Sequence, residues 1–174
     1  MKLLKYIAVV LAFSALATVL RYYNDYQTDR NNCNLQGKVV KLADGDSIVV
    51  LDSDNVQHKV RLQGIDAPER NQPYGKTAKK FLSDRVFGKT VCVGWSKRDR
   101  YKRVVGTVWI NGVDVAYQLV KAGLAWHYKR YQDEQTLYDR VRYAEAQETA
   151  EEGHLGLWSD RKPTAPWEWR KGRR

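Results

Sequence analysis

Four acidic residues in the first half of the chain have the type and spacing of a metal-binding or acid–base site. Asp44 and Asp46 flank a glycine at a tight turn, and Asp66 and Glu69 lie in the short loop 64–69, which contains a proline. Carboxylate oxygens are hard ligands that suit calcium, or less readily magnesium, rather than zinc. Asp-Gly turns are also common as solvated surface turns, so the turn by itself leaves that plainer interpretation open.

Two arginines could act together with these acids on a phosphate group. Arg61 alternates with apolar residues in a strand-like segment, and Arg103 follows the cationic segment 96–102. Hydrolysis of a phosphodiester needs a cation at the phosphate, donors for the charge that builds in the transition state, and an activated water. Two guanidinium groups on one phosphate would give bidentate contacts that lysine cannot replace. Each arginine could equally be an exposed surface charge, and periodicity does not decide between the two.

The composition indicates a basic globular protein with one core. The chain has 174 residues, 43% of them hydrophobic and 29% charged, which argues against disorder. Lys and Arg number 30 against 20 Asp and Glu, a formal charge of +10 that attracts nucleic acid or anionic membrane surfaces. The histidines and cysteines show no HxH, HxxxH or CxxC spacing, so a zinc site has no support.

Residues 1–20 have the pattern of a secretory signal. A basic start, 1–5, precedes the uncharged, mostly apolar run 6–20, which is short for a transmembrane helix. Ala15-Leu16-Ala17 fits a small-x-small cleavage site, although residues 18–20 continue the apolar run beyond it. We therefore expect an exported protein, secreted or periplasmic. The alternative is a membrane anchor formed by the uncleaved N-terminus.

The elements that must position the candidate residues are five strands, with one helix between the third and the fourth. Alternating apolar residues and turn signals predict a three-stranded meander, then a helix, then two strands ended by an Asn-Gly turn. Two helices follow, the first capped by Asp114 and the second with Leu137, Val141 and Ala144 on its inner side. This order predicts an α+β, mainly β fold: a five-stranded OB-type barrel with flanking helices. The predicted strands are 38–42, 47–51, 56–62, 90–95 and 103–110, and the predicted helices run from 75 to about 87, from 114 to 121 and from about 133 to 152.

Taken in order, the motifs closely resemble the staphylococcal-type thermonuclease family. They are Asp44-Gly45-Asp46-Ser47, the run from Val60 to Glu69, Asp99-Arg100-Tyr101-Lys102-Arg103, Gly123-Leu124-Ala125-Trp126 and Gly156-Leu157-Trp158. Each motif is weak alone, but the ordered set at this spacing is specific and covers roughly residues 37–159. The resemblance implies an OB-type barrel, one Ca2+ ion, and hydrolysis of DNA and RNA with little sequence specificity. We expect the protein to be a monomer.

The resemblance also implies a metal-ligand set. Asp46 and Asp66 would bind calcium through their carboxylates, and Ala67 through its backbone carbonyl. The family often has threonine where this chain has Ala67, but only the main-chain oxygen is needed. Asp44 would be a nearby carboxylate that supports the ligands.

The remaining implied roles are catalytic and substrate-binding. Glu69 would position or deprotonate the attacking water, while Arg61 and Arg103 would bind the phosphate and stabilise its transition-state charge. Tyr101 would lie near the scissile phosphate, and Arg100 in the surrounding cationic rim.

Two further points depend on the resemblance. The family usually has glycine where this chain has Lys102. A positive φ there would strain lysine and could re-aim Arg103, or Lys102 could add a phosphate contact. The family barrel also places the first and fourth strands side by side, which implies a Cys33–Cys92 disulfide rather than two free thiols.

The sequence predicts four segments, and it leaves one other function open. Residues 1–20 are expected to be a signal peptide or N-terminal anchor, 21–36 a linker, 37–160 the thermonuclease-like domain and 161–174 a basic tail that contains tryptophans. The tail could stack on nucleic acid, anchor at a membrane interface or remain flexible. The competing function is a non-catalytic OB-fold module that binds nucleic acid or protein. Such modules lose the acids and arginines, which are all present here.

Overall fold

The computed structural model describes residues 13–14, 16–21, 24 and 33–172. Most of the predicted signal or anchor, 1–20, and most of the predicted linker, 21–36, lie outside these residues, so both remain predictions. Across the described residues, the structure contains no helix with the length and apolarity needed to cross a membrane.

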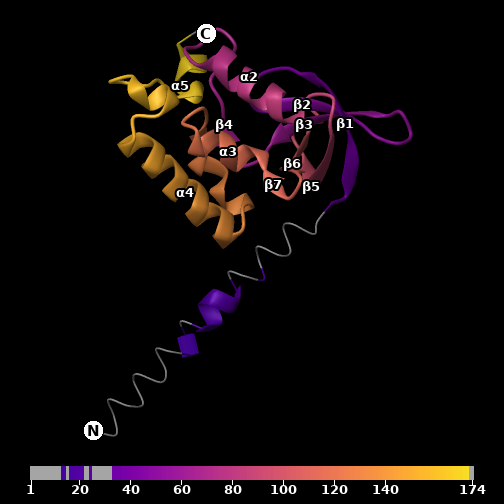
Figure 1. Cartoon of the computed structure of the whole chain (residues 1–174), viewed down its shortest axis with the longest axis horizontal. Coiled ribbons are helices and arrows are strands. Elements are labelled where there is room, and N and C mark those ends of the chain that lie inside the picture. The colour runs from indigo at the N-terminus through magenta and orange to yellow at the C-terminus, as the bar shows by residue number, and fades with distance from the viewer. Residues whose placement is uncertain (1–12, 15, 22–23, 25–32, 173–174) are drawn as a thin grey trace, which may run out of the picture.

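A curled β-sheet forms a closed barrel (Figure 1). Antiparallel pairing runs in the order β3-β2-β1-β5-β6, and a parallel pairing of β3 with β6 closes the barrel. The predicted five-stranded OB-type barrel is thereby confirmed. The strands are β1 Leu35–Leu42, β2 Ser47–Leu51, β3 Gln57–Leu62, β5 Thr90–Arg98 and β6 Val104–Ile110, with short additions at β4 Ile65–Asp66, β7 Val113–Asp114 and β8 Trp126–His127.

Alternation along the strands fills the barrel with branched apolar side chains. Successive residues of a strand point to opposite faces, so every second side chain is directed inward. Val39, Val50, Val60, Val93 and Val108 are completely buried in this way. The outward positions remain free for polar residues such as those of the candidate site.

Helices cover the barrel on one side. Helix α2 (Gly75–Val86) buries Ala78, Leu82 and Val86, and α3 (Val115–Lys121) begins at Asp114, whose side chain accepts hydrogen bonds from two backbone N–H groups. In Figure 1, α4 (Leu137–Glu152) is the orange helix at the lower left, and α5 (Pro166–Lys171) lies in the yellow segment that leads to the end marked C. The remaining helices are the 3-10 turn η1 Lys129–Glu134, α4 Leu137–Glu152, the 3-10 turn η2 Gly156–Ser159 and α5 Pro166–Lys171.

Two sequence-based predictions about the elements were wrong. The segment 96–98 is not loop but the end of β5, because a bulge after Trp95 lets Lys97 and Arg98 pair with β6. The inner face of α4 is not Leu137, Val141 and Ala144; it is formed by Asp139, Tyr143, Ala146, Gln147 and Ala150. Arg142 of this helix pairs with Asp114 and Asp139, so buried polar contacts set the orientation of α4.

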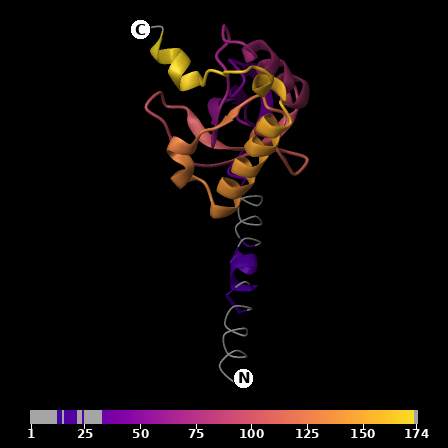
Figure 2. The ribbon, with the colours of Figure 1, turned by 90° about the vertical axis from the view of Figure 1, so that its left-hand side faces the viewer.

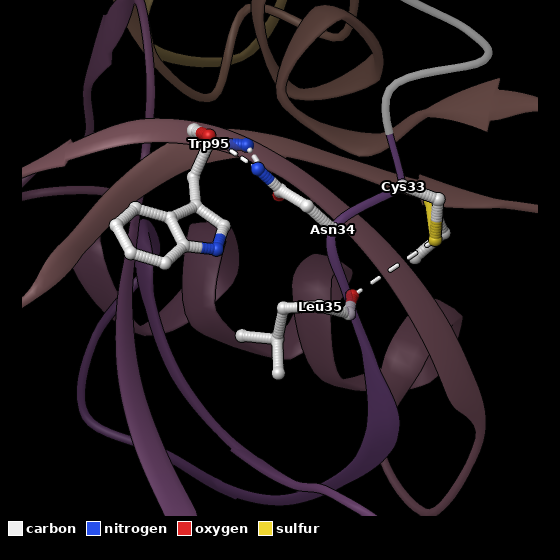
Figure 3. Close-up of a disulfide and its surroundings, with 5 residues drawn as sticks. Cys33, Asn34, Leu35 and Trp95 are labelled. Atoms are coloured by element: carbon white, nitrogen blue, oxygen red, sulfur yellow. Dashed lines mark hydrogen bonds between the residues drawn. A yellow bond between two sulfur atoms is a disulfide. The ribbon is translucent and has the colours of Figure 1, made fainter.

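The predicted disulfide between Cys33 and Cys92 is present (Figure 3). The Cα atoms of the two cysteines are 5.4 Å apart, because β1 and β5 pair with Gln36 opposite Cys92. Beside it, the Asn34 side chain accepts a hydrogen bond from the backbone N–H of Trp95 at 3.0 Å and donates one to its carbonyl at 2.7 Å. These contacts fasten the beginning of the barrel to β5.

Candidate active site

Arg61 brings the two predicted metal ligands together. Its Nη1 lies 2.8 Å from Oδ2 of Asp46, and its Nη2 lies 2.9 Å from Oδ1 of Asp66. Strand pairing produces this meeting, because Ser47 at the start of β2 lies opposite Arg61 on β3. Asp66 follows on β4, just beyond the end of β3. Asp46 and Asp66 therefore share one guanidinium group.

Both carboxylates are buried. Asp46 is 4% exposed and Asp66 is 1% exposed. Burial raises the pKa of Asp46 to about 8; the neighbouring carboxylates of Asp44 and Asp66 add to the rise, and Arg61 opposes it. Asp46 also accepts hydrogen bonds from the backbone N–H of Ala67 at 2.8 Å and from the hydroxyl of Ser47 at 3.0 Å. Burial thus disfavours the charged form of Asp46, and a cation bound beside it would favour that form.

This donor set fits a hard cation that is bound partly through non-side-chain oxygens. Among the described residues, no group of three or more His, Cys, Asp or Glu side chains is arranged to bind a metal ion. An ion at Asp46 and Asp66 would therefore use main-chain oxygen and water as further ligands, which calcium accepts readily. Ala67 is buried beside both acids and can offer its carbonyl. The carboxylate of Asp44 accepts the backbone N–H of Asp46 at 3.2 Å and shapes the turn.

A hydrogen-bonded turn before α2 orients Glu69. The backbone N–H of Glu69 donates to Oε1 of Gln72 at 3.1 Å, and the Gln72 N–H donates back to the Glu69 carbonyl at 2.8 Å. Gln72 is buried, and its Nε2 donates to the carbonyl of Thr164 at 2.6 Å. No local pattern distinguishes Gln72 in the sequence, because its role depends on a contact with Thr164 near the far end of the chain.

Arg103 is directed toward the acids by Asp99. The two carboxylate oxygens of Asp99 accept the backbone N–H of Arg103 at 2.9 Å and its Nε–H at 2.7 Å. Nη1 of Arg103 lies 3.5 Å from the hydroxyl of Ser47, which itself donates to Asp46. Arg103 therefore lies beside the shared site, on the β6 side of the β3–β6 pairing.

The backbone of Lys102 has the positive φ that would strain a lysine at this position. Its φ is 62°, and its backbone N–H donates to the carbonyl of Asp99 at 2.8 Å. The contacts of Asp99 with Arg103 keep the arginine aimed at Ser47 in spite of this conformation. Lys102 thus has the left-handed backbone conformation that strains a residue with a Cβ.

The predicted substrate-binding residues form an exposed rim rather than part of the buried cluster. Tyr101 is 63% exposed. The guanidinium carbons of Arg100 and Arg103 lie 4.9 Å and 5.5 Å from its ring centroid. Lys102 is exposed on the same turn. The rim presents positive charge and one aromatic face to solvent.

Arg170 of α5 enters the site, which the sequence did not predict. Its Nη2 lies 2.7 Å from Oδ2 of Asp66, and its Nη1 lies 2.8 Å from Oε1 of Glu69. The hydrogen bond to Asp66 is the main cause of a raised Arg170 pKa. In the sequence Arg170 is one of several basic residues in the tail, and no local pattern distinguishes it.

Comparison with known proteins assigns the chain to a family. Residues 59–160 match the family of staphylococcal nuclease homologues, so the chain belongs to that family. It is 37% identical over 164 residues to an uncharacterized endonuclease of Haemophilus influenzae, covering 94% of this chain and 83% of that protein. It is 40% identical over 138 residues to an uncharacterized endonuclease of Escherichia coli, covering 79% and 86%.

A plant protein is also similar. A probable staphylococcal-like nuclease of rice, Oryza sativa subsp. japonica, is 42% identical over 118 residues, which are 68% of this chain and 34% of that protein. Membership of this metal-dependent family supports a hydrolytic nuclease that acts on nucleic acid. The earlier resemblance to the thermonuclease family is confirmed.

Gly75 offers a test of how precisely Glu69 must be placed. A Cβ at this position would collide with the backbone carbonyl of Glu69. We expect Gly75→Ala to shift the turn and to reduce nuclease activity about tenfold to a hundredfold, because sub-ångström placement matters for catalysis. Turnover and circular dichroism should be measured beside Lys76→Ala, an exposed change on the same helix. A folded Gly75→Ala variant with full activity would show that the position of Glu69 is not critical.

Proposed function

We propose that this protein is a calcium-dependent phosphodiesterase that cleaves DNA and RNA with little sequence specificity. The observation that supports this most strongly is the shared guanidinium of Arg61 between the buried Asp46 and Asp66. Glu69 and Arg103 lie next to that pair, linked to it through Arg170 and Ser47 respectively. An acid pair, a candidate base and two phosphate-binding cations therefore occupy one site.

Each residue has a defined part in the proposed hydrolysis. Glu69 orients the attacking water and accepts its proton as the new P–O bond forms. Arg61 and Arg103 donate N–H hydrogen bonds to the phosphate oxygens and stabilise the added charge while the bond to the leaving sugar oxygen breaks and that oxygen takes up a proton from solvent water. Asp46, Asp66 and the Ala67 carbonyl would hold the calcium ion. When bound, calcium would neutralise the phosphate and make the water more acidic.

Broad substrate use follows from the kind of contacts available. Phosphate contacts carry no base sequence information, and the exposed rim of Arg100, Tyr101 and Lys102 suits a phosphate backbone. Tyr128 and Tyr131 lie with ring centroids 5.1 Å apart and could stack on unpaired bases. These features support action on single strands or frayed ends of either nucleic acid.

Export is part of the proposal. The Cys33–Cys92 disulfide suits an oxidising compartment, and residues 1–20 have the pattern of a secretory signal. A secreted or periplasmic enzyme is the proposed form, and a membrane-tethered enzyme with the same activity is the alternative.

The test compares single-stranded DNA and RNA with calcium and with a chelator, using the wild type, Glu69→Gln and Glu148→Gln. Cleavage should require calcium, and Glu69→Gln should lose about a hundredfold or more, as expected for a general base. Glu148 is exposed on α4, and its variant should retain full activity. Nucleic acid left intact in every condition, with salt-sensitive binding, would instead indicate a non-catalytic binding module.

A further inference from the structure

The C-terminal segment contributes a cation to the candidate active site. Arg170 donates hydrogen bonds to both oxygens of Asp66, at 3.3 Å and 2.7 Å, and to Oε1 of Glu69 at 2.8 Å. Asp66 is 1% exposed, so it is almost completely enclosed by these contacts and by Arg61. One guanidinium group therefore engages the proposed metal ligand and the proposed base at once.

Further contacts fix the segment that contains Arg170. The ring of Trp167 is stacked on Tyr128, with centroids 5.2 Å apart and planes inclined by 14°. It also packs edge-on against Trp126 at 5.4 Å. Upstream, the carbonyl of Thr164 accepts a hydrogen bond from the buried Gln72. Figure 2 shows the segment as the yellow helix at the C-terminal end, beyond the 3-10 turn at 156–159.

Arg170 and a divalent cation would be mutually exclusive at Asp66. Arginine remains positively charged at all ordinary pH values, so a cation bound to the same carboxylate would lie against a like charge. The carboxylate oxygens of Asp66 already accept hydrogen bonds from Arg61 and Arg170, and a metal ion would have to displace at least the latter. When Arg170 is bound to Asp66, Trp167 covers the face of Tyr128 on which an unpaired base could stack.

We propose that residues 161–172 form an autoinhibitory cap in which Arg170 competes with the catalytic cation for Asp66 and Glu69. The cap opens when the cation binds, and Trp167 on Tyr128 provides the contact that returns it. This inference rests on the cation site proposed above. The apparent cation affinity would equal the intrinsic affinity multiplied by the fraction of time that the site is open. A site closed about 90% of the time would therefore bind the cation about tenfold more weakly.

The cap is tested by calcium binding to the full chain, measured by titration calorimetry. Arg170→Ala should bind calcium about tenfold more tightly than the wild type. Lys171→Ala removes the same charge from the next residue, whose Nζ pairs with Oε1 of Glu168 at 2.8 Å, and should bind like the wild type. Arg170→Lys cannot engage Asp66 and Glu69 with one planar group, so its affinity should lie between the two.

A second readout separates the cap from a role in substrate binding. At limiting calcium Arg170→Ala should cleave DNA faster than the wild type, and at saturating calcium the two rates should converge. Equal calcium affinity in the wild type and Arg170→Ala, or slower cleavage by Arg170→Ala at saturating calcium, would overturn the cap while leaving the proposed function intact. Absence of calcium binding and of cleavage in both proteins would instead overturn the proposed function, and the cap with it.

Discussion

Replacing Arg61 with alanine is expected to reduce nuclease activity about a thousandfold and to lower the free energy of unfolding of the calcium-free protein by about 3–5 kcal/mol. Arg61 is only 14% exposed and neutralises both Asp46 and Asp66. Its loss leaves the buried Asp46 without the guanidinium partner seen in the structure and leaves Asp66 with Arg170 alone, so stability falls together with catalysis. A cation that binds only the folded state should restore part of the stability.

The measurement is urea denaturation of Arg61→Ala and the wild type, with a chelator and with saturating calcium, alongside turnover of single-stranded DNA. Arg103→Ala is the matched comparison. Arg103 pairs with Asp99 near the surface, with side chains 29% and 20% exposed, so its loss should cost about 1 kcal/mol or less of stability. Its activity should nevertheless fall about a hundredfold. Equal stability of the two variants would contradict the buried role assigned to Arg61.

Removing the disulfide is expected to have the second large effect. The cysteines are 59 positions apart in sequence, and a cross-link over such a loop stabilises a protein by about 4 kcal/mol in the chain-entropy model. A Cys33→Ser, Cys92→Ser double variant should therefore unfold at markedly lower urea concentration. The disulfide lies near Asn34 and Trp95 rather than among the acids (Figure 3), so the folded fraction should keep its activity.

Reduction of the wild type supplies the control for this result. A thiol reductant should shift the wild-type unfolding curve toward that of the double variant and leave the double variant unchanged. A wild type that is indifferent to reductant while the double variant is destabilised would attribute the loss to the serine side chains instead of the missing cross-link.

The barrel was predictable because local patterns and global pairing agree. The third strand of the meander alternates, the second is a run of branched apolar residues, and the turns carry the residues that tight turns require. The extension of β5 through Lys97 and Arg98 was missed because exposed polar residues at the end of a strand resemble a loop. Helix α4 was misjudged for a related reason: its buried face includes Asp139, which pairs with Arg142, so a search for an apolar stripe finds the wrong side.

The site was predictable in its residue types but not in its geometry. The acids and arginines could be selected from ordered motifs, yet only the pairing of β2 with β3 shows that Arg61 lies between Asp46 and Asp66. The contribution of Arg170 could not be predicted, because it lies 104 positions from Asp66 in the sequence and reaches it only through tertiary packing.

The parallel pairing of β3 with β6 affects when the folding chain can first cleave nucleic acid. Val60 lies opposite Val104 in that pairing. Arg61 follows Val60 on β3, and Arg103 directly precedes β6, so the pairing brings the two arginines to the same site. Pairing of strands far apart in sequence carries a large loop-closure entropy and forms slowly compared with hairpins. Without this pairing the barrel would be open, and only one of the two arginines would be held at a phosphate. Cleavage at the full rate therefore requires the β3–β6 pairing, which brings Arg61 and Arg103 to the same site.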